Sequence, residues 1–294
     1  MVLWLVFWGC ESMTPATTDQ ALYRLMEGSA DRSSRGHLGA SIIGDSCARK
    51  LWYGFHWVFE PWHEGRILRL FRRGQVEESF LESDLNLLPG VTVRTIDPAT
   101  GEQYRWTDPE LPGFSGSCDG VAYGLPEAPE EWIGLEFKTH SDKNFKQLKK
   151  NGVRKAYRKH FFQCQTYMFW SGLPAFIYIG VNKNTDELYT ELIEYDETAA
   201  HDARVMAREV LESKTPPPKI SNRPDWFECK FCNFWKLCHQ NEKPIDNCRT
   251  CEKSTYNERE HEWTCQSKRK SLTILDQRKG CEDHEIDPAI WIAE

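Results

Sequence analysis

The chain has 294 residues, of which 40% are apolar and 28% charged, and its net charge is −7. These values are typical of a globular protein with one sizeable core and a small appendage, and they argue against three domains and against a non-specific coat on nucleic acid. No apolar run reaches the length of a membrane span. The apolar N-terminal stretch MVLWLVFWGC lacks the basic residues of a secretory signal, so we interpret Met13 as the translational start and residues 1–12 as an upstream extension.

Apolar residues that recur with helical or alternating spacing predict the elements that follow. Helices are expected at 18–29, 67–85, 143–171 and 197–213. Hairpins are expected at 91–97 with 102–106 and at 174–184 with 187–195, and a strand at 113–124 is expected to pair with one at 132–140. The Pro-rich stretch at 214–226 is typical of a linker, and it leads to a cysteine-rich end.

Eleven cysteines are present, and their spacing indicates what they do. One group has the pattern C-x2-C-x5-C and a second opens with C-x2-C, the residues being Cys229, Cys232, Cys238, Cys248, Cys251, Cys265 and Cys281. In a chain of this length without a secretory signal, such spacing indicates metal binding by reduced thiols and a cytoplasmic location. Cys10, Cys118 and Cys164 fall outside both groups.

A run of one-signed charge lies between Lys143 and Lys159, with eight Lys and Arg residues and no acid. A solvated helix face would explain it. The lack of compensating carboxylates instead favours contact with a polyanion such as DNA.

The stretch IGLEFKTH at 133–140 carries Glu136 and Lys138 two positions apart, so a strand would place both side chains on one face. An ordinary amphipathic strand with a solvated ion pair would account for this spacing. The alternative is a carboxylate that binds a metal beside a lysine that orients a nucleophilic water. Mg²⁺ and Mn²⁺ prefer hard oxygen ligands, and a bound divalent cation lowers the pKa of its water.

Further polar positions fall in an order that this chemistry can use. Glu78 lies in a Gly-x3-Glu pattern on a predicted helix, Asp119 ends a predicted strand, and Gln163 and Tyr167 form a Gln-x3-Tyr pattern on the next helix. Carboxylates from two strands and one helix can together hold a divalent cation. The lysine can then offset charge in the transition state, and the glutamine can position water or phosphate.

At these residues the sequence resembles a known family. GSCDG followed by GLEFKTH resembles the PD-(D/E)XK nuclease signature, with Asp119 as the first acid and Glu136 and Lys138 as the E-x-K pair. The flanking Gly-x3-Glu and Gln-x3-Tyr patterns are similar to those of the RecB-like branch. That branch often has His where this chain has Glu78, for which Glu77 is the close alternative.

The resemblance implies a restriction-endonuclease-like α/β core with a mixed central sheet flanked by helices, although Cys118 stands where the family name has proline. It implies catalytic roles for Asp119, Glu136, Lys138, Gln163 and Tyr167. It implies metal ligation by Glu78, Asp119 and Glu136.

The stretch SCARKLWY at 46–53, followed much later by C-x2-C-x5-C, resembles the iron–sulfur RecB-like nucleases, which include CRISPR-associated exonucleases and the nuclease domain of AddAB-type helicase–nucleases. One cysteine before the nuclease core and three after it bind a [4Fe–4S] cluster in that group. By position the resemblance implies Cys47, Cys229, Cys232 and Cys238. The spacing alone also permits a four-cysteine zinc site, and we favour iron–sulfur because the context around Cys47 matches as well.

The second cysteine group is expected to bind Zn²⁺ through Cys248, Cys251, Cys265 and Cys281, with His284 or His261 as substitutes for one thiolate. So few apolar residues surround it that this end of the chain should need a metal to fold. It is similar to C-terminal appendages of phage-encoded RecB-like exonucleases.

Together these features predict a Mg²⁺- or Mn²⁺-dependent exonuclease for linear DNA, single-stranded or at duplex ends, in phage or bacterial recombination, repair or DNA degradation. A structure-specific or restriction-type endonuclease is the alternative among enzymes, and a non-catalytic, metal-stabilised DNA-binding scaffold is the alternative of another class. A recombination or replication protein, or a second copy of the chain, would be its protein partner, and the host cytoplasm its location if phage-encoded. We divide the chain into an N-terminal extension and helix (1–45), a nuclease domain with the iron–sulfur site (46–240) and a zinc module (241–294).

Overall fold

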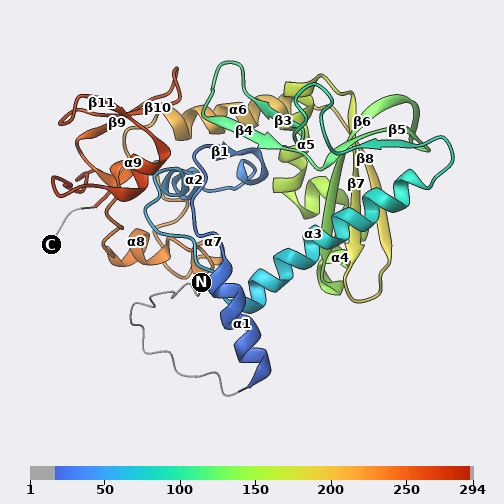
Figure 1. Cartoon of the computed structure of the whole chain (residues 1–294), viewed down its shortest axis with the longest axis horizontal. Helices are drawn as coiled ribbons and strands as arrows, with labels where there is room; N and C mark the ends of the chain where they lie inside the picture. The colour runs from blue at the N-terminus through green and yellow to red at the C-terminus, as the bar shows by residue number, and fades with distance from the viewer. Residues whose placement is uncertain (1–16, 292–294) are drawn as a thin grey trace, which may run out of the picture.

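The computed structural model describes residues 17–291, which fold as a mixed α/β protein (Figure 1). The proposed upstream extension, Met13 and Cys10 lie outside these residues. A five-stranded sheet packs against helices on both faces, and the described chain has two further sheets of three strands each. The predicted α/β core with a mixed central sheet flanked by helices is confirmed.

The five-stranded sheet has the order β2-β5-β6-β7-β8. Its strands are β2 (Thr92–Arg94), β5 (Gly120–Leu125), β6 (Ala128–His140), β7 (Ala175–Asn182) and β8 (Leu188–Glu194). β6 and β7 are parallel whereas the other neighbours are antiparallel, so the hairpin predicted at 174–195 is present. A parallel pair needs a crossover connection, and α4 (Asp142–Ala156) and α5 (Arg158–Ser171) provide it.

The alternation of side chains along β6 separates its residues between two helical layers. Leu135 and Phe137 share an apolar cluster with Leu81 of α3 (Gly65–Asn86), the helix predicted at 67–85. Glu136 lies on the opposite face and is aligned with Tyr178 of β7, which packs with residues of α4 and α5. Glu136 is therefore covered by α5, while its apolar neighbours are covered by α3.

The single strand predicted at 113–124 is wrong, because the chain passes there from one sheet to another. The first half is β4 (Phe114–Ser117), which pairs with β1 (Leu38–Gly39) and β3 (Arg105–Thr107), and the second half is β5 of the main sheet. Gly120 makes this passage possible: its φ is +157°, and a Cβ there would lie 2.8 Å from the carbonyl oxygen of Arg94.

The hairpin predicted at 91–97 and 102–106 is also wrong as drawn. β2 pairs with β5, β3 pairs with β4, and only the bridge between Ile96 and Gln103 joins the two segments as a hairpin would. Alternation predicted two strands correctly, but it does not determine which partner each strand takes.

The single helix predicted at 143–171 is two helices, α4 and α5. Gly152 has φ 69°, and the backbone N–H of the next residue, Val153, donates to the carboxylate of Glu191 at 2.8 Å. Tyr157 then leaves the helical region with φ −139° before α5 begins. A carboxylate from β8 thus takes a hydrogen bond that a continuous helix would have made internally.

The described chain contains six further helices. They are α1 (Thr18–Ser29), α2 (Ala48–Phe55), α6 (Glu197–Glu212), α7 (Phe227–Lys230), α8 (Trp235–Gln240) and α9 (Ile274–Lys279), with 3-10 turns at Ala40–Ile42 and Cys248–Thr250. α1 and α6 match the helices predicted at 18–29 and 197–213. A third sheet contains β9 (Ser254–Asn257), β10 (Glu262–Cys265) and β11 (Lys270–Leu272). Within residues 17–291, no helix has the length and apolar character needed to cross a membrane.

Arg249 joins the C-terminal segment to the N-terminal part of the core. Its guanidinium is buried and donates to the carbonyl oxygens of Phe55 at 2.7 Å and Gly36 at 2.9 Å. It also lies 3.7 Å from the centre of the Trp57 ring and 5.2 Å from that of Trp263. A cation held by carbonyls and aromatic faces, with no carboxylate in contact within the described residues, is compatible with burial only while all of these partners stay in place.

Candidate active site and cysteine-lined cavity

Glu136 and Lys138 form an ion pair at the centre of β6. Oε1 of Glu136 contacts Nζ of Lys138, and the glutamate is fully buried whereas 27% of the lysine side chain is exposed. Asp119 lies at the junction just before β5, and its Oδ2 accepts a 2.7 Å hydrogen bond from the backbone N–H of Phe137. The two strands thus place both acids and the lysine in one site.

Helix α5 adds Gln163 and Tyr167 to this site. Nε2 of Gln163 donates to Oε2 of Glu136 at 3.0 Å and lies 3.4 Å from the Tyr167 hydroxyl. That hydroxyl donates to the carbonyl oxygen of Ser117 at 2.6 Å, two residues before Asp119. The five residues that the resemblance marks as catalytic are therefore neighbours in the fold.

Glu78 approaches the site from α3. Burial, together with the charge of Asp119, raises the pKa of Glu78. Glu77 and Glu78 both line a small cavity with Lys138, but it is the charge of Glu78 that helps to raise the pKa of Glu136. This electrostatic contact favours Glu78 over Glu77 as the third acid.

The electrostatics of Glu136 are unusual for a carboxyl group. Complete burial raises the pKa of Glu136 to about 8, and the charges of Asp119 and Glu78 act in the same direction against the opposing effect of Lys138. Oε1 of Gln163 is buried and accepts no hydrogen bond, whereas Oε1 of Glu136 is buried and has the Lys138 ammonium as its partner. A buried acceptor without a donor is suited to a cation or to an ordered water.

A cavity of about 370 Å³ adjoins the site on α5 and is lined by Gln163 together with Arg35 and Arg105. Both arginines donate to serine hydroxyls, Arg35 to Ser41 at 3.2 Å and Arg105 to Ser115 at 2.8 Å. Within residues 17–291 neither arginine forms an ion pair. Sequence reasoning missed both, because an isolated arginine in a loop or short strand belongs to no pattern.

The basic run at 143–159 forms more ion pairs than its sequence predicts. The acids come from other elements or from the start of α4, in the pairs Lys146–Asp142 (2.7 Å), Lys149–Glu187 (2.5 Å), Arg154–Asp196 (2.7 Å) and Lys159–Asp45 (2.6 Å). Among the described residues, Lys143, Lys150, Lys155 and Arg158 of this run form no ion pair. The excess of positive charge on α4 is thus about half of what the sequence indicates.

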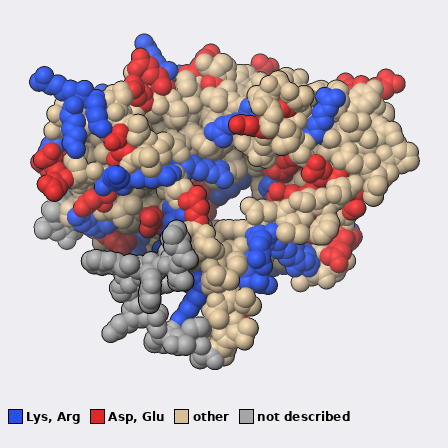
Figure 2. Space-filling view, viewed as in Figure 1, with Lys and Arg blue, Asp and Glu red and all other residues tan. Residues whose placement is uncertain are grey.

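A second basic surface lies on α3. Arg66, Arg69, Arg72 and Arg73 line a cavity of about 440 Å³ along this helix, and Figure 2 shows Lys and Arg gathered over its first half. Arg73 donates to the carbonyl oxygen of Lys183 at 2.9 Å, while the other three pair with no acid in the described chain. We call these four residues the α3 arginines.

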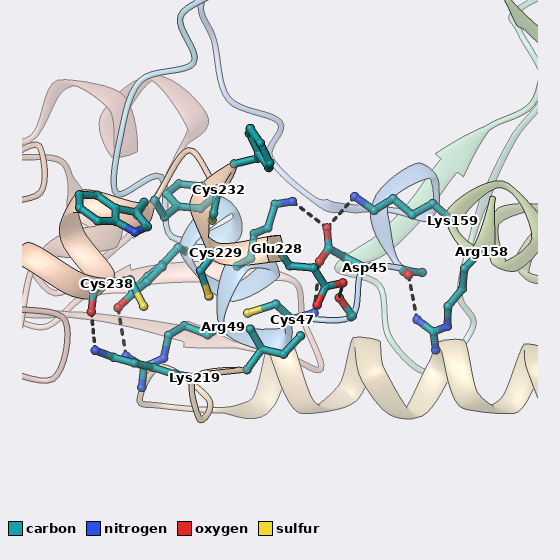
Figure 3. Close-up of a pocket in the computed structure, with 18 of the residues that line it drawn as sticks. Asp45, Cys47, Arg49, Arg158, Lys159, Lys219, Glu228, Cys229, Cys232 and Cys238 are labelled. Atoms are coloured by element: carbon teal, nitrogen blue, oxygen red, sulfur yellow. Dashed lines mark hydrogen bonds and ion pairs between the residues drawn. The ribbon is translucent and has the colours of Figure 1, made fainter. Parts of the chain in front are cut away.

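Four cysteines from three segments surround one cavity of about 420 Å³, drawn in Figure 3. They are Cys47 at the start of α2 and Cys229, Cys232 and Cys238 on and around α7 and α8. Burial raises the pKa of Cys229, and the charges of Cys238 and Cys47 raise it further. The fold therefore brings Cys47 next to partners more than 180 residues later in the chain, as the position-based assignment requires.

The second cysteine group is also gathered in space. Burial raises the pKa of Cys248 to about 11, with further contributions from Cys251, Cys281 and Cys265. His284 and His261 are engaged elsewhere, since His284 Nε2 lies 3.2 Å from a threonine hydroxyl and His261 Nδ1 lies 2.9 Å from a tyrosine hydroxyl. Cys118 and Cys164 are fully buried core thiols.

None of these groups is arranged as a finished metal site. In the part of the chain that the structure describes, no set of three or more His, Cys, Asp or Glu side chains has an arrangement that could hold a metal ion. Metal ligation by the acids or by the cysteines therefore requires side chains to rotate toward a common point.

Comparison with known proteins gives distant structural similarity only. No family model and no curated protein matches the sequence. The crystal structure of SSO0001 is similar, with 17% identity and a TM-score of 0.43 over 75% of this chain and 95% of that chain. An alkaline exonuclease (LHK-Exo) from Laribacter hongkongensis has 13% identity and a TM-score of 0.43 over 64% of this chain and 90% of its own. Its complex with dAMP has the same identity and TM-score over 65% and 90%. Likenesses of this degree assign no activity.

Proposed function

We propose that the chain is a metal-dependent deoxyribonuclease that hydrolyses phosphodiester bonds at DNA ends. The observation that carries this proposal is the convergence of Asp119, Glu136, Lys138 and Gln163 on one buried site. A fully buried carboxylate with a raised pKa is costly to keep in a core, and a purely structural strand has no need of it.

Glu78, Asp119 and Glu136 would hold Mg²⁺ or Mn²⁺, and Oε1 of Glu136, which already contacts a cationic group, fits such a ligand role. A bound divalent cation would polarise the phosphodiester and lower the pKa of a water. For the carboxylate to serve as a ligand, Glu136 must lose its proton and Lys138 must move off Oε1. The displaced ammonium would then be free to orient the attacking water and to offset charge on the phosphate, while Gln163 keeps its hold on Oε2.

The surrounding cations suit a DNA substrate. Arg35 and Arg105 line the cavity next to Gln163 without carboxylate partners, and guanidinium groups bind phosphate oxygens well. The limitation to DNA ends rests on the resemblance to RecB-like exonucleases.

The two cysteine groups would bind different metals. Cys47, Cys229, Cys232 and Cys238 supply the four thiolates that a [4Fe–4S] cluster needs, and all four line one cavity. Cys248, Cys251, Cys265 and Cys281 would hold Zn²⁺.

The test is an assay of purified protein on end-labelled linear DNA, circular single-stranded DNA and nicked circles, with Mg²⁺ or Mn²⁺ and with EDTA as control. Glu136→Gln protein is the matched inactive control, and iron and zinc are measured on the same samples. Cleavage of linear DNA alone supports an exonuclease, and cleavage of intact circles would instead indicate an endonuclease. Binding without any metal-dependent cleavage by iron-replete protein would reduce the chain to a scaffold.

A further inference from the structure

Asp45 connects the cysteine-lined cavity to helix α5. It precedes Cys47 by two residues, and its Oδ1 accepts a 3.2 Å hydrogen bond from the Cys47 backbone N–H. Its Oδ2 forms ion pairs with Lys50 at 2.8 Å and with Lys159 at 2.6 Å. Figure 3 shows Asp45 between the cysteines on one side and Lys159 and Arg158 on the other. Only 5% of Asp45 is exposed, so these contacts replace its hydration.

The segment that carries Asp45 lies directly on the first turn of α5. Arg158 donates to the carbonyl oxygen of Gly44 at 2.8 Å. A Cβ on Gly44 would lie 2.7 Å from the Cα of Lys159, so no larger residue fits between this segment and the helix. Two side-chain contacts and one close backbone approach thus hold the segment and the helix together.

The first turn of α5 lacks the negative charge that a helix N-terminus favours. It contains Arg158 and Lys159 but no acid, and its N-cap residue, Tyr157, makes no side-chain capping hydrogen bond. Cations at this end are opposed by the helix dipole. Asp45 supplies the missing negative charge from a segment more than a hundred residues earlier in the chain.

The same helix also carries the side chain that hydrogen-bonds to the candidate catalytic carboxylate on β6. Gln163 lies one turn beyond Lys159 and donates to Oε2 of Glu136 at 3.0 Å. A shift of the first turn of α5 would therefore move the amide that orients Glu136. The path from Cys47 to Glu136 consists of Asp45, Lys159 and Gln163, each joined to the next by a contact or by one turn of helix.

We propose that Asp45 is a positioning residue that couples the cysteine cavity to the active site, by holding the first turn of α5 in place when Cys47 is fixed by its bound group. The inference rests on the proposed iron–sulfur site and on the proposed nuclease function. When Cys47 is released, the Asp45 contact loosens, α5 frays at its start, and Gln163 no longer holds Glu136 in one orientation.

The test uses full-length iron-replete protein and measures amide hydrogen exchange across residues 158–164, without DNA or added Mg²⁺, so that it does not depend on nuclease activity. Asp45→Asn and Lys159→Gln should each accelerate exchange there by about tenfold while iron content and visible absorbance stay near wild type. The double variant should add little to either single one, because both remove the same contact. Lys155→Gln, which removes an unpaired lysine near the end of α4, is the matched control and should leave hydrogen exchange at 158–164 unchanged.

Removal of iron by a chelator provides the second arm. Wild-type protein should then show the same faster exchange at 158–164, whereas Asp45→Asn protein, already uncoupled, should show no further change in that segment. The proposed coupling would be refuted if the two substitutions had additive effects on the exchange rate at 158–164. It would also be refuted if iron removal left the exchange rate of α5 in wild-type protein unchanged. Failure of the nuclease assay with these exchange results intact would refute the proposed function alone.

Discussion

Gln163 donates a hydrogen bond to one oxygen of Glu136, and Lys138 contacts the other, so the buried carboxylate is held from a helix and from its own strand at once. The helix contact fixes the orientation of the group, whereas the lysine contact balances its charge. A cation can replace the lysine but not the glutamine, since ammonium and metal ion compete for the same oxygen. In the proposed function, a metal ion would therefore take the place of the ammonium at this oxygen.

Loss of the carboxylate of Asp119 or of Glu136 should abolish cleavage. Asp119→Asn or Glu136→Gln is expected to lower the rate by roughly a hundredfold or more, because the metal would lose a ligand. Lys138→Met should also lose activity but should still bind Mn²⁺, and more tightly, because the competing ammonium is gone. Electron paramagnetic resonance of bound Mn²⁺ separates the two effects. Wild-type turnover in any of the three would end the nuclease assignment.

Metal affinity should rise with pH. The pKa of Glu136 is raised from 4.5 to about 8, so protons compete with a cation for this carboxylate near neutral pH. The affinity for Mn²⁺ should thus increase by up to about tenfold per pH unit below about pH 8 and then level off. Titration calorimetry across this range measures it, and Glu136→Gln protein should show a flatter dependence.

The same proton affects the stability of the metal-free protein. Because the folded pKa of Glu136 lies above its unfolded value, the folded state binds more protons between pH 4.5 and about 8, and stability falls as pH rises through that window. Relative to Glu136→Gln, wild-type protein in EDTA should therefore become less stable between pH 5 and pH 8. Thermal melts of both proteins at matched pH test this, and a constant difference in Tm would place the pKa near its ordinary value.

Cys47 should behave like the distant cysteines of its cavity. Cys47→Ala and Cys232→Ala are each expected to lose iron and visible absorbance, and to lower Tm, because the cluster would lose one of four ligands. Cys164→Ala removes a fully buried thiol outside the cavity and should keep full iron content. Elemental analysis by mass spectrometry provides the readout. Full iron in Cys47→Ala protein would remove this residue from the site.

The salt dependence of DNA binding should come from the unpaired cations. Substitution of Arg69 and Arg72 on α3, or of Lys150 and Lys155 on α4, is expected to reduce the slope of log K against log salt by about 0.7 to 0.9 for each phosphate that the protein no longer neutralises. Removal of Lys149 and Arg154 should change it less, because Glu187 and Asp196 already neutralise them. Fluorescence anisotropy with metal-free Glu136→Gln protein measures binding without cleavage. Equal effects from paired and unpaired residues would show that the ion pairs open on DNA.

Local sequence patterns correctly predicted those features that depend on neighbouring residues in the chain. The alternation in IGLEFKTH correctly placed Glu136 and Lys138 on one face, and helical spacing located α1, α3 and α6. Partner choice was not predictable in the same way, since β4 and β5 look like one strand until the sheets that receive them are known. The irregularity at Gly152 is accompanied by a hydrogen bond to Glu191, which lies on another element, β8.

The candidate site also combines residues that belong to local sequence patterns with residues that do not. Its acids, lysine and glutamine belong to ordered patterns, so sequence reasoning could group residues that the fold places together. Arg35 and Arg105 belong to none and were missed, and the acids that neutralise α4 come from distant elements and could not be counted. Charge along a sequence is therefore a poor guide to free charge on a surface when the compensating groups lie far away in the chain.

The position of Arg249 has a consequence for how the protein is made. The carbonyl of Phe55 that it binds is synthesised 194 residues earlier, and the carbonyl of Gly36 earlier still. Until the C-terminal segment leaves the ribosome, those carbonyls lack their donor and the face of Trp57 lacks its cation. The emerging chain must therefore stay in solution while this aromatic pocket is incomplete. Expression at lower temperature or with added chaperones should increase the yield of intact protein. A chain that stops before Arg249 should aggregate.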